Sequence, residues 1–309
     1  MTTNFSDQVQ LLVQLLPLVA KQSCFALKGG TAINLFVRDM PRLSVDIDLV
    51  YLPVEDRNTS LKAIDAALAS IGEDIESLLP GSRVTDRVLR GTKFRQRLVV
   101  QRGNTTVKME VTPVLRGSLF PPVVQALSAS VQRRFGYAEM QVLSFEELYA
   151  GKICAALDRQ HPRDLFDVKL LLENEGITED LKNAFLVYLM AHNRPMVELL
   201  APNEIDITDL YHAEFEGMVN EAVSLPVLLN ARSDLVKALH ARLDNSDKEF
   251  LLSVKRGDAD WSRFVFPQAV NLPAIQWKLQ NLEKMGDQKR REALDKLHTL
   301  LLGYARRGV

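Results

Sequence analysis

The sequence predicts an α+β protein in which a mixed sheet flanked by helices precedes a helical C-terminal part. Short alternating, strand-like runs such as "SVDIDLVYLP" and "TTVKMEVTP" mix with helical patterns before residue 175. Helical periodicity dominates after it, as in "TEDLKNAFLVYLMAH". The turn signal "RGN" at 102–104 favours a hairpin. We therefore expect two domains, residues 1–175 and 176–309.

Composition limits the class of protein. A chain of 309 residues is long enough for two domains with a sizeable core. The net charge of −1 excludes a generally basic, histone-like protein but allows a local basic groove. Two cysteines this far apart in sequence do not indicate a disulfide framework, and a reducing cytoplasm fits better. The apolar opening "VQLLVQLLPLVAKQ" predicts an amphipathic helix, neither a signal peptide nor a membrane span.

An acidic pair lies on one predicted strand. In "LSVDIDLV", residues 43–50, polar and apolar residues alternate, so Ser44, Asp46 and Asp48 share a face. Residues two apart on a strand lie roughly 6 to 7 Å from each other, and their carboxylates can converge on shared cations. Two divalent ions about 3.5 to 4 Å apart can stabilise phosphoryl transfer. The alternative is an ordinary half-buried strand with a solvated acidic face.

A glycine pair precedes this strand. In "LKGGTAINLF", residues 27–36, an apolar run ends in Gly29 and Gly30, and Thr31 opens a helical pattern. Glycines permit close approach of a ligand to the backbone, and the N–H groups at a helix start can hold phosphate oxygens. A turn followed by a helix N-cap explains the same residues.

A third carboxylate lies on a later strand. In "TVKMEVTP", Lys108, Glu110 and Thr112 share a face. If this strand lies beside that of Asp46, Glu110 completes a three-carboxylate site, and one of the three carboxylates can accept the proton of an attacking hydroxyl. A surface alternation of lysine and glutamate is the alternative.

Two helices are predicted between residues 143 and 173. Ser144 with Glu147 forms a capping-box signal, so a helix begins there and carries Lys152 in its third turn. On the next helix, Arg163 and Asp167 are four residues apart on one face. A cation turned toward the carboxylates would hold triphosphate charge. A surface salt bridge is the alternative.

Taken in this order, the motifs resemble those of the AbiEii/AbiGii toxin family, which includes the MenT-type toxins and belongs to the DNA polymerase β-like nucleotidyltransferase superfamily. The matching stretches are "LKGGTAINL", "SVDIDLVYLP", "LYAGKICAALDR" and "PRDLFDVKLL". The helical remainder, with "KEFLLSVKRGDADW" and "LPAIQWKLQNLEK", is also similar to C-terminal halves of this family. The resemblance therefore implies a nucleotidyltransferase domain of this fold followed by a helical domain.

The resemblance also implies roles for single residues. The metal ligands it implies are Asp46 and Asp48, with Glu110 as the candidate third carboxylate. The implied nucleotide-binding residues are Lys28, Gly29, Gly30, Thr31, Ser44, Lys152 and Arg163. The implied catalytic residues are Asp46, Asp48, Lys152 and Asp167.

The implied reaction transfers a nucleoside monophosphate from a nucleoside triphosphate (NTP) to an RNA acceptor, with Mg²⁺ or Mn²⁺ as cofactor. Toxins of this family are taken to modify the 3′ end of tRNA, which blocks aminoacylation and translation. The resemblance further implies a cognate antitoxin, and we expect a cytoplasmic monomer that does not bind membranes.

A basic segment precedes the strand of Glu110. From Arg87 to Lys108 the chain has no acidic residue, and Lys93, Arg95 and Arg97 alternate. These three predict a positive strip on one strand face that tracks an RNA backbone. A solvated edge strand protected by charge is the alternative.

Two other functions stay open at this point. One is a nucleotidyltransferase that acts on a protein hydroxyl or a small molecule, which would not need the basic strip. The other is a non-catalytic module that keeps the fold in order to bind an antitoxin.

Overall fold

The computed structural model describes residues 2–305, and the chain divides into two compact units. Unit 1 comprises Met1–Leu148 and Met218–Glu221, and unit 2 comprises Tyr149–Gly217 and Ala222–Val309. The division thus falls close to the start of a helix that begins at Phe145, whereas the change of sequence pattern lies near residue 175.

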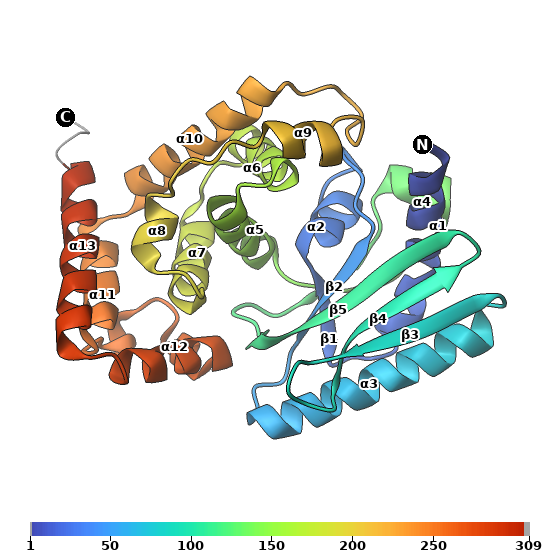
Figure 1. Ribbon diagram of the computed structural model, residues 1–309, viewed down its shortest axis with the longest axis horizontal. Helices are drawn as coiled ribbons and strands as arrows, with labels where there is room; N and C mark the ends of the chain where they lie inside the picture. Colours follow the sequence, from blue (N-terminus) through green and yellow to red (C-terminus); the bar gives the residue numbers. More distant parts are fainter. Residues whose placement is uncertain (1, 306–309) are drawn as a thin grey trace. The chain divides into compact units, whose positions relative to one another are not determined.

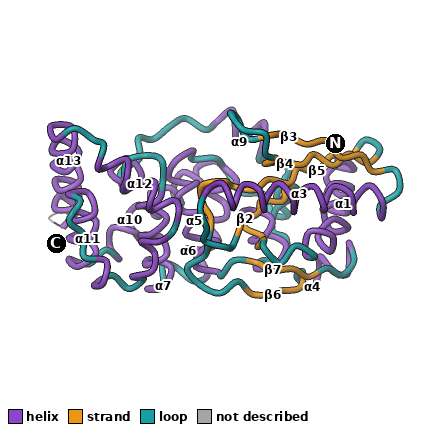
Figure 2. The backbone as a smooth tube through the Cα atoms, turned by 90° about the horizontal axis from the view of Figure 1, so that it is seen from below, coloured by secondary structure: helices purple, strands orange, loops and turns teal. Residues whose placement is uncertain are grey.

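Unit 1 is built on a seven-stranded mixed sheet with the order β3-β4-β5-β2-β1-β7-β6 (Figure 1). The strands are β1 (Phe25–Lys28), β2 (Asp46–Tyr51), β3 (Ser82–Val88), β4 (Arg95–Arg102), β5 (Thr105–Arg116), β6 (Val123–Ala126) and β7 (Glu139–Val142). β1 is antiparallel to β2 and parallel to β7, and β2 is parallel to β5. Figure 2 shows β3 and β6 at opposite edges. The predicted α+β class with a mixed sheet is therefore confirmed.

The predicted hairpin joins β4 and β5. These strands are antiparallel, and Arg102 pairs with Thr105 at the closed end. Gly103 and Asn104 form the two-residue connection, and Gly103 has a φ of 57°. A positive φ is common in such short turns, where glycine meets it without steric cost.

Helices cover the sheet of unit 1. They are α1 (Thr2–Ala20), α2 (Gly29–Ala32), the π-helix η1 (Ile33–Val37), α3 (Arg57–Leu78) and α4 (Ala129–Phe135). α1 packs against β5 and β7, and α3 packs against β3 and β4. On the strands, Ile47, Leu49, Met109 and Val111 have no exposed surface. Burial of each such side chain stabilises the fold by about 1.5 to 3 kcal/mol.

Every described element of the chain after β7 is a helix. These helices are α5 (Phe145–Arg159), α6 (Pro162–Asn174), α7 (Glu179–Ala191), α8 (Met196–Leu200), α9 (Thr208–Glu214), α10 (Leu225–Arg242), α11 (Asn245–Arg256), the 3₁₀ helices η2 (Trp261–Arg263) and η3 (Pro267–Asn271), α12 (Pro273–Glu283) and α13 (Asp287–Ala305). Within unit 2, α10 packs against α6 and α11 against α13. None of the described helices combines the length and apolar character that crossing a membrane requires.

The two helices predicted between residues 143 and 173 begin where the sequence signals lie. The Ser144 hydroxyl accepts a hydrogen bond from the Glu147 N–H at 3.2 Å, just before α5. α6 begins at Pro162, and the His161 side chain accepts a hydrogen bond from the Arg163 N–H. Proline is favoured at the first helical position because its missing N–H would have no partner there.

Candidate active site

The two glycines after β1 lie against side chains of β2 and of the segment before it. Gly29 has a φ of +76°, and a Cβ there would lie 2.8 Å from a carboxylate oxygen of Asp48. At Gly30 a Cβ would lie 2.9 Å from a guanidinium nitrogen of Arg42 and 3.0 Å from the Ser44 hydroxyl. Only glycine meets both the left-handed conformation and the close approach at Gly29.

Thr31 ties this turn to the start of β2. α2 begins at Gly29, two residues before the helix start that the pattern predicted. The Thr31 hydroxyl lies 3.0 Å from that of Ser44 and donates a hydrogen bond to the backbone carbonyl of Asp46. Thr31 is therefore not a helix N-cap. It fixes the backbone position of the first aspartate of β2.

The acidic pair shares a sheet face with Glu110. β2 and β5 are neighbours, as expected, and Asp48 lies directly opposite Glu110 in their parallel register. On the other side of β2, Asp48 lies opposite Lys28 of β1. Directly opposed residues of neighbouring strands point to the same face of a sheet. Asp48, Glu110 and Lys28 therefore lie side by side, and Asp46 is on the same face.

Glu110 is engaged in an ion pair. Its Oε2 accepts from the Arg97 guanidinium, at 2.8 Å from Nε and 2.5 Å from a terminal nitrogen. Its Oε1 accepts from the Gln96 side chain at 3.2 Å. Within residues 2–305, no three His, Cys, Asp or Glu side chains are grouped so that they could hold a metal ion. Asp46 and Asp48 offer the oxygen ligands that hard divalent cations take, whereas Glu110 is held by Arg97.

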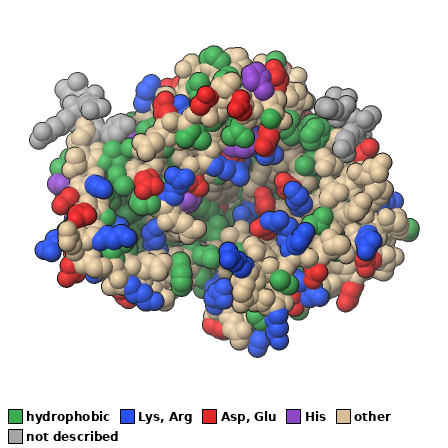
Figure 3. Space-filling model, viewed as in Figure 1, with side chains coloured by type: hydrophobic (Ala, Val, Ile, Leu, Met, Phe, Trp, Pro, Cys, Tyr) green, Lys and Arg blue, Asp and Glu red, His purple; other side chains and the backbone are tan. Residues whose placement is uncertain are grey.

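The basic residues do not form the predicted strip. β4 begins at Arg95, and Lys93 lies in the preceding turn. The Arg95 guanidinium pairs with Asp65 of α3 at 3.1 Å and with Asp86 of β3 at 2.9 Å. Arg97 is paired as described above. The expectation of one continuous positive strand face is wrong, because acidic residues from other elements neutralise two of its three members. Figure 3 shows basic and acidic side chains interspersed over the visible face (Figure 3).

Unit 2 contains a buried group of charges. The Lys152 ammonium lies 2.7 Å from a carboxylate oxygen of Asp164 and 2.9 Å from one of Asp167. The residues are only 6%, 1% and 1% exposed, respectively. Arg159 also binds Asp164, with its Nε at 2.6 Å and a terminal nitrogen at 3.1 Å. Lys152 and Asp167 are thus in contact, and Lys152 bridges α5 and α6.

Asp164 stays ionised within this group. Burial alone would raise the pKa of its carboxyl, but the charges of Lys152 and Arg159 and their hydrogen bonds lower that pKa well below its usual range. Breaking such a buried network by removing one partner is costly, because a charge is left without compensation.

Arg163 lies apart from the buried charges. Its guanidinium is 3.3 Å from a carboxylate oxygen of Glu214 on α9, and that oxygen is 3.1 Å from the His161 ring. Burial lowers the pKa of His161, although the contact with Glu214 opposes this effect. Arg163 and Asp167 are therefore not partners, although they are four residues apart on α6.

Sequence reasoning missed Asp164 and Arg159. A signal for Asp164 was present, because residues three apart on a helix are neighbours, so Asp164 and Asp167 lie on one face of α6. The role of Arg159 was not visible, since no local pattern distinguishes it from other arginines at the end of a helix.

A comparison with protein families decides the assignment. The family described as "Nucleotidyl transferase AbiEii toxin, Type IV TA system" matches residues 10–281. The chain belongs to the AbiEii nucleotidyltransferase toxin family. The AbiEii match covers both candidate groups of residues, the one around Asp48 and the one around Lys152, and makes the chain a toxin-type nucleotidyltransferase.

A solved structure supports the AbiEii fold. The chain is similar to MenT4, a nucleotidyltransferase toxin of Mycobacterium tuberculosis H37Rv, with 15% sequence identity and a TM-score of 0.60. The similarity covers 96% of this chain and 93% of MenT4. At this identity it shows a common fold. A comparison with curated proteins found none that matches the chain.

Proposed function

We propose that this AbiEii protein transfers a nucleoside monophosphate from an NTP to an RNA acceptor, the 3′ end of tRNA, and thereby blocks aminoacylation. The observation that carries the proposal is the packing of the Asp48 carboxylate against the backbone of Gly29. Glycine at this position leaves room for a carboxylate beside a turn whose backbone a nucleotide can approach. A solvated acidic face on an ordinary strand would not require it.

Asp46 and Asp48 would hold the divalent cations, Mg²⁺ or Mn²⁺. Bound there, these ions would supply charge stabilisation for the transferring phosphoryl group. Glu110 lies in register beside Asp48, and its contribution as a third ligand requires that its ion pair with Arg97 opens. Lys28, on the same face, is placed to attract the triphosphate by charge.

The turn of Gly29 and Gly30 would position the nucleotide through its backbone. Thr31 and Ser44 would serve this site by fixing the turn against β2, since their hydroxyls lie 3.0 Å apart. Both residues thus remain candidate nucleotide-binding residues, with a positioning contribution that the hydrogen bonds support.

In unit 2, we propose that Lys152, Arg163 and Asp167 contribute to nucleotide binding and catalysis, as the family motifs imply. Lys152 is 6% exposed and holds Asp167 in place through their ion pair. The Arg163 side chain is 32% exposed, so its guanidinium is more accessible to a triphosphate than the Lys152 ammonium is.

The partners follow from the family. A type IV toxin–antitoxin system implies an antitoxin, and we propose that a cognate one neutralises this protein. Lys93 remains a candidate for RNA binding. Arg95 and Arg97 could bind RNA phosphates only in competition with the carboxylates that they already pair with. We expect a monomer in the cytoplasm.

A labelling experiment tests reaction and acceptor together. The pure protein is incubated with Mg²⁺, total RNA and each labelled NTP in turn. We expect label on small RNA with one preferred NTP. Label on protein alone, or on a small molecule alone, would instead establish the alternative nucleotidyltransferase function.

A further inference from the structure

The sheet of unit 1 has one face that α3 does not cover. α3 packs against β3 and β4 on the other face (Figure 1), and a Cβ at Gly72 of α3 would lie 3.6 Å from a methyl carbon of Val84 on β3. Because side chains alternate along a strand, Val84 faces α3, and Arg83, Thr85 and Arg87 point away from it. These three side chains are exposed.

The strand register connects this open face to the acidic pair. Arg87 lies opposite Arg97 of β4, which lies opposite Glu110 of β5. Glu110 lies opposite Asp48 of β2. Neighbouring strands are about 4.8 Å apart, so the backbone of Arg87 is roughly 14 Å from that of Asp48. We call this surface the β3–β5 face, and its residues are Arg83, Thr85, Arg87, Arg97, Val99, Gln101, Thr106, Lys108 and Glu110.

Three cations of the β3–β5 face are free. Arg83, Arg87 and Lys108 are exposed, and none of them takes part in an ion pair among residues 2–305. The fourth cation, Arg97, is neutralised by Glu110, which is the one acid among the nine residues. The face therefore carries a surplus of positive charge, which attracts phosphates. The free cations lie on β3 and β5, whereas the sequence pattern had indicated β4.

The neutral residues of the β3–β5 face are also suited to a nucleic-acid backbone. Thr85, Gln101 and Thr106 offer hydroxyl and amide groups, which together with arginine and lysine make most contacts to phosphate and sugar. The one apolar member is Val99, which is half-buried. Interfaces between proteins depend on buried aromatic and apolar anchors. The composition of this face therefore favours RNA over an acidic protein.

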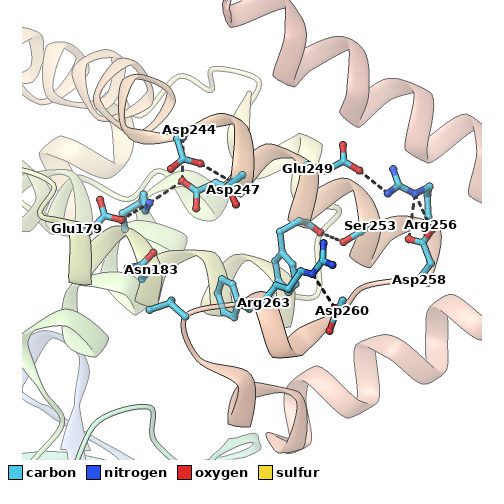
Figure 4. A pocket seen from close by; sticks show the side chains of 15 residues that line it. Glu179, Asn183, Asp244, Asp247, Glu249, Ser253, Arg256, Asp258, Asp260 and Arg263 are labelled. Atoms are coloured by element: carbon cyan, nitrogen blue, oxygen red, sulfur yellow. Dashed lines mark hydrogen bonds and ion pairs between the residues drawn. The ribbon is translucent and has the colours of Figure 1, made fainter.

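A cavity of unit 2 beside α7 and α11 shows the opposite charge balance. It is lined by Lys182, Arg256 and Arg263 and by a larger number of carboxylates. Lys182 and Arg256 each pair with two carboxylates and Arg263 with one, and Figure 4 marks the pairs of both arginines (Figure 4). These cations are neutralised, so this cavity is not a phosphate-binding surface.

We propose that the RNA acceptor lies across the β3–β5 face, with its 3′ end at Asp46 and Asp48. Arg83 and Arg87 are four residues and about 13 Å apart along β3, so they bind separate phosphates of the RNA backbone. Lys108 lies opposite Asp46 and binds a phosphate closer to the 3′ end. This surface serves the transfer to RNA proposed above, on which its assignment to RNA rests.

Titration of labelled total tRNA with the full-length protein tests the surface without the reaction. Fluorescence anisotropy is measured in the absence of NTP over a series of salt concentrations. Arg83→Gln combined with Arg87→Gln should weaken binding about tenfold and lower the slope of log K against log salt concentration by about 1.4 to 1.8, because two phosphate contacts are lost. In the transfer assay, KM for RNA should rise about tenfold while KM for NTP stays unchanged.

A matched control and a second variant accompany this pair. Arg57→Gln combined with Lys62→Gln removes two exposed cations from α3, on the covered side of the sheet, and should change RNA affinity less than twofold. Charged residues on an edge strand can also serve to prevent self-association, and β3 is an edge strand. Lys108→Gln lies on the inner strand β5 and should weaken RNA binding about threefold even if the β3 variant self-associates.

The outcomes separate this surface from the proposed reaction. If the wild-type protein labels RNA but the β3 variant and Lys108→Gln bind RNA as tightly as the control, the surface is wrong and transfer to RNA stands. If the wild-type protein labels no RNA yet binds it through these residues, the proposed reaction is wrong and the surface stands. Binding of poly-L-glutamate without binding of tRNA would overturn the assignment and favour an acidic protein.

Discussion

Glu110 lies directly opposite Asp48 across β2 and β5, yet its carboxylate binds Arg97. The strand register places the side chains of Asp46, Asp48 and Glu110 on one sheet face. Of these, the Glu110 carboxylate is occupied by its ion pair with Arg97. Metal binding by Glu110 and its ion pair with Arg97 therefore compete for the same carboxylate oxygens.

Glu110→Gln should raise the Mg²⁺ concentration needed for half-maximal nucleotidyl transfer by about tenfold, since an amide is a weaker metal ligand than a carboxylate. The measurement is the Mg²⁺ dependence of label incorporation. The matched control is Glu139→Gln on β7, an exposed glutamate outside the site. An unchanged Mg²⁺ dependence would mean that Glu110 only pairs with Arg97 and does not bind metal.

Gly29→Ala should lower the transfer activity about a hundredfold, because the added methyl group displaces the Asp48 carboxylate. Gly81→Ala is the control. Gly81 has a similar φ of +81°, but a Cβ there meets nothing within 4 Å. Both variants should lose about 1 to 2 kcal/mol of stability from the backbone conformation, and only Gly29→Ala should lose activity. Equal activity of the two variants would separate Gly29 from the site.

Lys152→Met should lower the free energy of unfolding by about 3 to 5 kcal/mol, because it removes the buried ammonium that pairs with both Asp164 and Asp167 and leaves Arg159 alone to compensate Asp164. Lys169→Met on α6 should cost less than about 1 kcal/mol, since its partner Glu173 is half exposed. Urea unfolding followed by far-UV circular dichroism measures both. A similar small loss in both variants would show that the ion group of Lys152 does not stabilise unit 2.

Acid should weaken the buried ion group of Lys152, Asp164 and Asp167. The pKa of Asp164 is lowered in the folded state, so its contribution to stability is complete above the unfolded pKa of about 3.9 and declines as the pH falls below that value. Urea midpoints should therefore begin to drop below about pH 4 and continue to fall toward about pH 2. Asp164→Asn should flatten this dependence. A midpoint profile with the same slope in the variant would rule out Asp164 as a source of the acid sensitivity.

Local patterns predicted the parts of the fold that depend on neighbours in sequence. Alternation predicted the strand of Asp46 and Asp48, and the Gly103 turn predicted the β4–β5 hairpin, because side-chain direction and turn chemistry are local properties. The pairing of β2 with β5 could not be predicted in this way, because other elements separate the two strands in sequence. The three-carboxylate site was therefore expected only if these strands were neighbours.

Local sequence patterns could not predict the long-range ion pairs. Arg95 binds Asp65, 30 residues away, and this contact exists only because α3 packs against β4. A charge pattern cannot reveal which carboxylate will face a given arginine in the folded chain. For the same reason, alternation predicted a free positive strip where the structure has neutralised arginines.

Asp48→Asn tests most directly whether the Asp46–Asp48 pair carries the reaction. With Mg²⁺, the preferred labelled NTP and total RNA, this variant should incorporate label at least about a thousandfold more slowly, with an unchanged far-UV circular dichroism spectrum. Asp74→Asn, which removes an acidic partner of Lys21 outside the site, should retain activity. Label incorporation and cell toxicity that persist in Asp48→Asn would contradict a metal-dependent transferase and favour a non-catalytic, antitoxin-binding module.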